Sequence, residues 1–160
     1  NIWRKPLDEV LRERIMNPIG SSNEWRWHGY RNSWVEIDGE EIQSPSGGGH
    51  WGGGFIISTL DHARYGYLFM NKGKWKDEQL LSQRWFKMAT TPSPTNNRYG
   101  YLWWLNTNKS IPNASSDSFY ASGAGGNYIW IDQENELLIV MRWIPKMREV
   151  ISAFTKSIKK

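Results

Sequence analysis

Apolar residues recur at helical spacing in four segments of the chain. In each segment they fall three or four positions apart, which is typical of a helix with one buried face. Ser58 or Thr59 stands in an N-cap position, and Asp61 follows Ser58 at the spacing of a capping box. The third segment ends before TTPSP, whose prolines cannot continue a helix. The predicted helices are 6–16, 58–70, 82–89 and 145–158.

Other segments carry strand patterns. Asp38-Gly39 separates two short alternating runs, which predicts a two-residue hairpin turn. The continuous apolarity of 137–143 indicates a central strand that is covered on both faces. The polar segment 106–118 predicts a surface loop. The predicted strands of the main sheet are 101–105, 127–131 and 137–143, the last two paired as an antiparallel hairpin.

The order of these elements predicts the fold class. Helices and hairpin strands follow one another without βαβ alternation, and the chain contains no internal repeat. This order favours an α+β fold, in which an antiparallel sheet is packed against helices. We expect the 145–158 helix to lie on one face of that sheet.

Composition narrows the function classes. The 160 residues suit one domain, and the net charge of +4 is too dispersed to indicate a nucleic-acid partner. The chain has no cysteine, and its three histidines lack metal-ligand spacing, so we expect neither a metal nor a cofactor. No apolar run is long enough for a membrane span, and no signal peptide is visible, although the sequence begins with Asn1. Eleven tryptophans are typical of a well-filled core, a pocket-rich protein or a sugar-contacting protein.

The stretch SGAGGN at 122–127 places three glycines just before a predicted strand. It fits neither of the glycine-rich phosphate-binding patterns, and no helix follows it. Two interpretations remain open. The glycines form either a β-bulge or a strand edge whose N–H groups face a developing oxyanion on a closely approaching ligand.

Three stretches, in this order, resemble one family of enzymes. They are GGGHWGGGFIISTLDHARYGYLFMNKGKW, YGYLWWLN and ASGAGGNYIWIDQENELLIVMRW. The chain is similar to the C-terminal half of serine hydrolases of the class C β-lactamase and penicillin-binding-protein-like superfamily, above all its esterase and nylon-oligomer-hydrolase-like members. The opening KPLDEVLRERIMNPIG also resembles a helix of this family, so the resemblance covers essentially the whole chain.

The resemblance implies a β-lactamase-like (DD-peptidase-like) fold and acyl transfer on an ester or amide. Such enzymes use a Ser-x-x-Lys, a Tyr-x-Asn and a third motif on a strand that lines the site. The third motif falls on Ala121, Ser122 and Gly123, and the oxyanion donor falls on the backbone N–H of Ala124. Ala121 provides no Lys or His charge for a substrate carboxylate, which argues against true β-lactamase activity. The other expected pocket residues are Trp51, Trp104, Asn127 and Tyr128.

The nucleophile and the tyrosine are not credibly present. Ser157–Lys160 matches Ser-x-x-Lys by letter at a polar helix end, which is typical of a chance match. Tyr30-Arg31-Asn32 follows the first helix, whereas the family motif precedes it. We therefore expect residues 1–160 to be the C-terminal part of a single domain whose N-terminal part carries both motifs. The resemblance implies an extracytoplasmic or secreted location.

These expectations are compatible with more than one function. The isolated chain is expected to be inactive, because it offers only an oxyanion donor and pocket walls. The expected partners are a small ester or amide substrate and the missing N-terminal half. An alternative is a non-catalytic ligand- or carbohydrate-binding domain, which the tryptophans and glycines would also suit.

Overall fold

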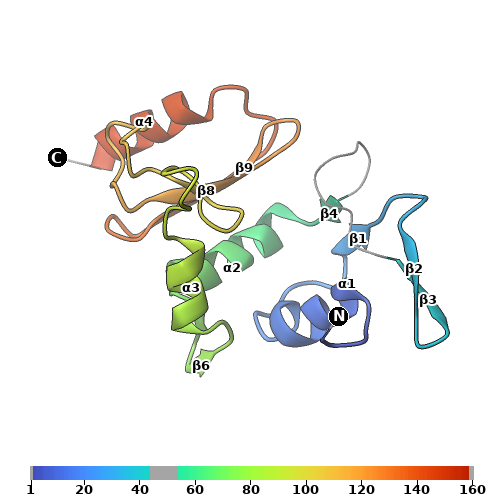
Figure 1. The fold of residues 1–160 in the computed structure, drawn as a ribbon. Helices are drawn as coiled ribbons and strands as arrows, with labels where there is room; N and C mark the ends of the chain where they lie inside the picture. The colour runs from blue at the N-terminus through green and yellow to red at the C-terminus, as the bar shows by residue number, and fades with distance from the viewer. Residues whose placement is uncertain (1, 44–53, 159–160) are drawn as a thin grey trace. The chain divides into compact units, whose positions relative to one another are not determined.

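The computed structural model describes residues 2–43 and 54–158. The chain groups into two compact units, Asn1–Arg64 and Tyr65–Lys160. Helix α2 (Thr59–Met70) runs across the boundary between them. Figure 1 shows the elements of each unit. Whether all 160 residues belong to one domain, as the sequence indicates, stays a prediction.

The first unit begins with the predicted amphipathic helix. It consists of α1 (Leu7–Leu11) and a wider helical turn, η1 (Arg12–Met16). In that turn the Asn17 N–H donates to the carbonyl of Arg12, five residues back, at 2.9 Å. Val10, Ile15 and Met16 are buried while Leu7 at the start is exposed, and the two segments together confirm the predicted helix 6–16.

Two short antiparallel ribbons complete the first unit. The first pairs β1 (Arg26–His28) with β4 (Gly54–Ile56), and the second pairs β2 (Trp34–Ile37) with β3 (Glu40–Gln43). Asp38 and Gly39 connect β2 and β3 with φ angles of 56° and 83°, both left-handed. Two consecutive left-handed residues are what a tight hairpin turn of the predicted kind requires.

Asp61 joins two distant segments of the first unit. Its carboxylate, 1% exposed, accepts hydrogen bonds from the backbone N–H and hydroxyl of Ser22 at 3.0 and 2.5 Å. It also accepts from Ser58 Oγ at 3.0 Å and from Arg64 Nη1 at 2.6 Å. The Asp61 N–H in turn donates to Ser58 Oγ at 3.0 Å, which confirms the predicted cap of α2.

These contacts predict a pH-dependent contribution to stability. Burial raises the pKa of Asp61, but the hydrogen bonds from Ser22, Ser58 and Arg64 together lower it further, so the pKa lies below its usual value. A lowered folded-state pKa stabilises the fold above the unfolded pKa of about 3.9, and this contribution disappears as the pH falls through the folded value. Asp61→Asn should therefore cost about 1–3 kcal/mol at pH 7 and less at pH 3, as measured by urea unfolding.

Asp8→Asn is the matched control, because Asp8 is exposed in the first turn of α1. An Asp61→Asn penalty that is the same at both pH values would contradict the role of the carboxylate charge.

The second unit contains a four-stranded antiparallel sheet in the order β10-β9-β8-β7. Before it come a small ribbon, β5 (Lys74–Trp75) with β6 (Glu78–Gln79), and helix α3 (Gln83–Ala89). Ser82 caps α3 by accepting a hydrogen bond from the Trp85 N–H at 3.1 Å, which agrees with the predicted helix 82–89. The sheet strands are β7 (Trp104–Leu105), β8 (Phe119–Gly123), β9 (Asn127–Asp132) and β10 (Leu137–Met141).

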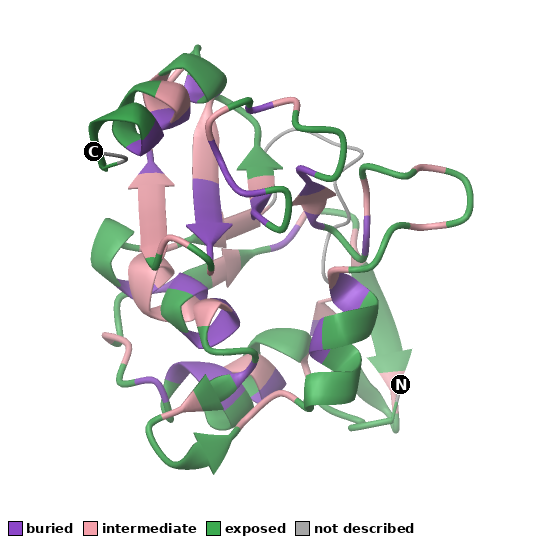
Figure 2. Cartoon of the chain, turned by 90° about the vertical axis from the view of Figure 1, so that its left-hand side faces the viewer, coloured by how far each residue is buried: buried purple, intermediate pink, exposed green. Residues whose placement is uncertain are grey.

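Alternate residues of the sheet face two separate apolar clusters. Phe119, Ile129 and Ile131 pack with Phe69 of α2 and Phe86 of α3. The intervening residues pack on the other face against Met147 and Ile151 of α4 (Met147–Ile158), and they are Tyr120, Trp130 and Met141. The predicted packing of the last helix on one sheet face is therefore confirmed. Figure 2 shows buried stretches on the strands and on the helices.

The structure corrects two details of the sheet prediction. β10 is covered on both faces, as its apolar run indicates, but it ends the strand order of the described sheet and is not central. β10 is apolar because helices cover both of its faces, not because a second strand lies beside it. β8 was not among the strands predicted from periodicity, because Ala121, Ser122 and Gly123 give no β-branched or aromatic signal.

Gly66 allows α2 to approach the sheet closely. A Cβ at this position would lie 2.3 Å from Ile129 Cδ1 and 2.7 Å from Leu138 Cδ1. Gly66→Ala should therefore destabilise the protein by about 1–3 kcal/mol through overpacking, despite the ~1 kcal/mol that alanine gains over glycine in a helix. Urea unfolding followed by tryptophan fluorescence measures the change.

Ile129→Val provides the matched test, since it removes the methyl group that the new Cβ would meet. The double variant should be more stable than the sum of the two single changes predicts. Strict additivity would show that the close approach is not the cause.

Candidate active site

Within residues 2–43 and 54–158, the outer edge of β8 has no strand partner at its C-terminal end. Trp104 pairs with Tyr120 and Leu105 pairs with Phe119, but β7 contributes no partner for Ser122. In this register the partner would be Leu102, which has a left-handed φ of 63° and is 80% exposed. The predicted strand 101–105 is thus shortened to Trp104–Leu105, because the chain turns before it reaches Ser122.

The backbone of Ser122 faces this open edge. The Asn106 N–H donates to the Ser118 carbonyl at 3.0 Å, so Ser118 directs its polar backbone groups toward the β7 side. Alternate residues of a strand direct these groups to the same side, which places those of Tyr120 and Ser122 there as well. Ala124, just beyond the strand, is exposed, and its N–H donates to no acceptor within the described residues.

The glycines around Ala124 serve two purposes. Gly125 and Gly126 have φ angles of 75° and 79°, and they form the turn between β8 and β9. A Cβ on Gly126 would lie 2.6 Å from the Ile144 carbonyl oxygen, and the Ile144 N–H donates to the Gly126 carbonyl at 3.0 Å. Gly123 is different, because a Cβ there would meet only Asn127, at 3.6 Å. The fold therefore requires glycine at 125 and 126 but leaves open space beside Gly123.

A cavity of about 530 Å³ lies beside the open edge, on the α4 face of the sheet. Tyr120, Ser122 and Tyr128 contribute side chains from β8 and β9, and Trp104 contributes one from β7. Trp104 stacks on Tyr120 with a centroid distance of 6.4 Å and an interplanar angle of 17°. The volume and aromatic lining are typical of a small-molecule site.

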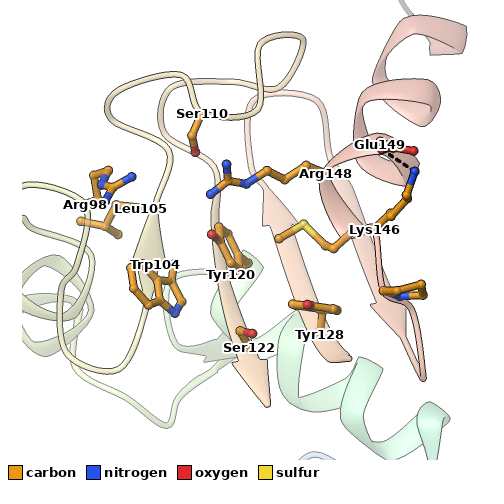
Figure 3. Close-up of a pocket in the computed structure, with 12 residues that line it drawn as sticks. Arg98, Trp104, Leu105, Ser110, Tyr120, Ser122, Tyr128, Lys146, Arg148 and Glu149 are labelled. Carbon is orange, nitrogen blue, oxygen red and sulfur yellow. Dashed lines mark ion pairs between the residues drawn. The ribbon is translucent and has the colours of Figure 1, made fainter. Parts of the chain in front are cut away.

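The far side of this cavity is basic. Figure 3 shows the side chains of Arg148 and Ser110 directed toward one another above Tyr120. Lys146 pairs with Glu149 at 3.2 Å, whereas Arg98 and Arg148 form no ion pair within the described residues. The cavity lining therefore carries two uncompensated positive charges, which favour a ligand with an anionic group.

Ser110 reaches the cavity from the 106–118 segment. The buried Asn106 holds this segment inward: its side-chain amide donates to the carbonyls of Ile111 and Ser115 at 3.2 and 2.9 Å. Its carbonyl oxygen accepts from the Ile111 N–H at 3.0 Å. Buried Asp132 accepts from the Ser115 N–H at 3.1 Å. The prediction of a surface loop is thus wrong for its middle, where Ile111 is fully buried.

The structure distributes the sequence-predicted site residues as follows. Ser122, Trp104 and Tyr128 line the cavity. Gly123 and Ala124 continue the edge next to Ser122, while Trp51 lies outside the described residues. Asn127 donates to the Ala124 carbonyl at 2.8 Å and accepts a bond from Arg142 at 3.4 Å, so its side chain supports the turn.

Sequence reasoning missed most of the cavity lining, including Tyr120, Arg98 and Arg148. The only available signal was the two-residue spacing of Tyr120 and Ser122, which places both on one face of a strand. The two arginines carry no local signal, because they reach the cavity from segments far from β8 in the sequence.

The letter matches to the catalytic motifs form no catalytic arrangement within the described residues. Ser157 Oγ donates to the Phe154 carbonyl at 2.7 Å on an exposed helix end, and Lys160 lies outside the described residues. The Tyr30 carbonyl accepts from Ser33 Oγ at 2.8 Å within a turn. In the ranges 2–43 and 54–158, no three acidic, His or Cys side chains gather as a metal site, and no helix has the length and apolarity to cross a membrane.

Comparison with solved structures identifies the fold. The structure of a "putative beta-lactamase from Bacteroides dorei DSM 17855" superposes over 98% of this chain with a TM-score of 0.59 and 13% sequence identity. The chain has a β-lactamase-like fold. It spans about half (53%) of the length of that β-lactamase-like protein.

Another solved structure gives a weaker match. A "putative 6-aminohexanoate-dimer hydrolase from Bacillus anthracis" matches 66% of this chain and 29% of its own length, with a TM-score of 0.48 and 22% identity. No model of a protein family and no curated protein sequence matches the chain.

The two kinds of glycine predict different responses to the same substitution. Gly126→Ala should cost about 1–3 kcal/mol, because it combines a left-handed φ with a backbone collision. Gly123→Ala should change stability by no more than about 0.5 kcal/mol, because the new methyl group enters open space. Thermal unfolding followed by circular dichroism compares the two variants. Equal losses of stability in the two variants would contradict the conclusion that the space beside Gly123 is open.

Proposed function

We propose that the chain forms the substrate-lining part of a serine hydrolase that acts on an ester or amide by acyl transfer. The open outer edge of β8 at Ser122–Ala124, next to a cavity, is the observation that supports this most directly. The β-lactamase-like fold supports it as well.

In this proposal the Ala124 N–H donates to the oxyanion of the tetrahedral intermediate. It is exposed and has no acceptor within the described chain, so no hydrogen bond must break when a ligand arrives. The absence of a side chain at Gly123 leaves room for an acyl group beside the edge. A preorganised backbone donor of this kind is a usual source of transition-state stabilisation in acyl transfer.

The cavity residues take the remaining parts of the substrate. Trp104, Tyr120 and Tyr128 provide apolar and aromatic walls, and the Ser122 backbone is placed to pair with an extended acyl chain. The uncompensated charges of Arg98 and Arg148 favour an anionic group on the substrate. These two arginines lie in other segments and provide the positive charge that Ala121 does not.

The nucleophile, its base and the relaying tyrosine are assigned to a part of the enzyme outside these residues. Among the described residues, no His or Asp lines the cavity, and the one lysine in this lining, Lys146, is paired with Glu149. Acyl transfer needs a nucleophile, a base and an oxyanion hole in one geometry, and the proposed contribution of this chain is only part of the oxyanion hole. The proposed partner is therefore the N-terminal half of the same protein.

Serine-directed labelling tests the assignment. The 160-residue chain alone should give no covalent adduct with a fluorophosphonate or a β-lactam and no burst of product, as measured by intact mass and stopped flow. Labelling of any serine in the isolated chain, Ser157 included, would overturn the assignment.

A second experiment tests the oxyanion donor in the longer enzyme. Ala124→Pro removes the N–H and should lower kcat by about 10²–10³. Gly123→Ala is the companion variant, which should fold normally and raise KM or lower kcat by crowding the edge. Circular dichroism establishes folding in both cases. A folded Ala124→Pro enzyme with unchanged turnover would refute the role of this donor.

A further inference from the structure

The second unit has another cavity, on the opposite face of the same sheet. It measures about 580 Å³. Phe86 and Phe119, both buried, contribute to its lining and belong to the cluster that packs α2 and α3 on the sheet. Tyr120, the neighbour of Phe119, instead lines the candidate active site with Met147. Of the described residues, Leu105 is the one that borders both cavities.

The rim of this cavity is basic. Lys72 follows α2, while Arg84 and Lys87 lie on α3, and all three are exposed. Within the described ranges none of the three forms an ion pair with a carboxylate. Asp117 is the one acidic residue among the described residues of the lining, so these residues carry a net charge of 3 − 1 = +2. Neighbouring charges of one sign above an apolar floor strengthen the electrostatic potential at the mouth of the cavity.

Several hydroxyl and amide groups of this lining are already committed as donors, which leaves the uncharged donors of Gln83 and Ser116 beside the three cations. Thr90 donates to the Phe86 carbonyl at 3.0 Å, and Ser118 donates to the Ser115 carbonyl at 2.7 Å. The Gln133 amide donates to the Met70 carbonyl at 2.5 Å. The three cations are therefore the main donors available to an incoming ligand, and a group that binds them should be an anion.

We propose that this cavity binds a small amphipathic anion, with an apolar body over Phe86 and Phe119 and one carboxylate or phosphate group at Arg84 and Lys87. The apolar residues of the floor favour a ligand with an apolar body over a purely ionic one. The unpaired cations favour a charged ligand over a neutral one. An arginine and a lysine one helical turn apart on α3 can contact the same head group. The site is independent of the proposed catalysis, because it lies on the other face of the sheet.

Isothermal titration of the protein with octanoate and with octyl phosphate tests this proposal, and comparison of the two distinguishes the head groups. 1-Octanol serves as the neutral ligand of similar length. At least one of the two anions should bind, 1-octanol should bind at least about tenfold more weakly, and 0.5 M NaCl should weaken anion binding.

A pair of charge-matched variants locates the site. Arg84→Gln with Lys87→Gln should weaken anion binding by about tenfold. The double variant Lys74→Gln with Lys76→Gln removes the same charge from exposed positions outside the cavity. It should leave the affinity for the anion within about twofold of the original value. All the changes are at exposed positions, and circular dichroism verifies the fold. Absence of binding by both anions, equal binding of 1-octanol, or equal weakening by the two double variants would overturn the proposal.

Discussion

Burial of β9 on both faces is the constraint on which the second unit depends. Ile129 and Ile131 are enclosed from the side of α2 and α3, and Trp130 is enclosed from the side of α4. Because side chains alternate along a strand, one six-residue segment anchors both layers of helices. A change of register by one residue would exchange the two sets of side chains, so the packing also fixes which face of β8 carries the candidate site.

The candidate site arises where this regular packing stops. β8 is paired with β9 along its whole length, which keeps it in place, but β7 pairs with only its first two residues. The strand therefore combines one firmly held edge with one edge that is free at Ser122. A ligand can therefore approach a backbone edge that its pairing with β9 holds in place.

Much of the fold could be predicted from local patterns. The capping of α2 by Ser58, the Asp38-Gly39 turn and the 127–141 hairpin each follow from a few neighbouring residues. β8 could not be found in the same way, since its last three residues are small. The shortening of β7 was also unpredictable, because Leu102 adopts a left-handed conformation that its sequence does not favour.

The candidate site could be predicted only in part, because only some of its residues lie in segments with a recognisable local pattern. Ser122 and Trp104 lie in segments whose residues resemble a known family, and the structure places both on the cavity. Arg98 and Arg148 reach it from segments fifty residues apart in the chain, which only tertiary packing brings together. Likewise, sequence patterns gave no reason to distinguish Gly123 from Gly126, whereas the space around their Cβ positions does.

The turn at Leu102 also bears on self-association. An unpaired strand edge can recruit any extended chain, including another copy of the same protein, and long exposed edges are a recognised route to aggregation. Here the free edge of β8 extends only from Ser122 to the turn at Gly125, too short for a stable intermolecular ladder. Because the free edge ends there, it is long enough for a short extended ligand but too short for a foreign strand.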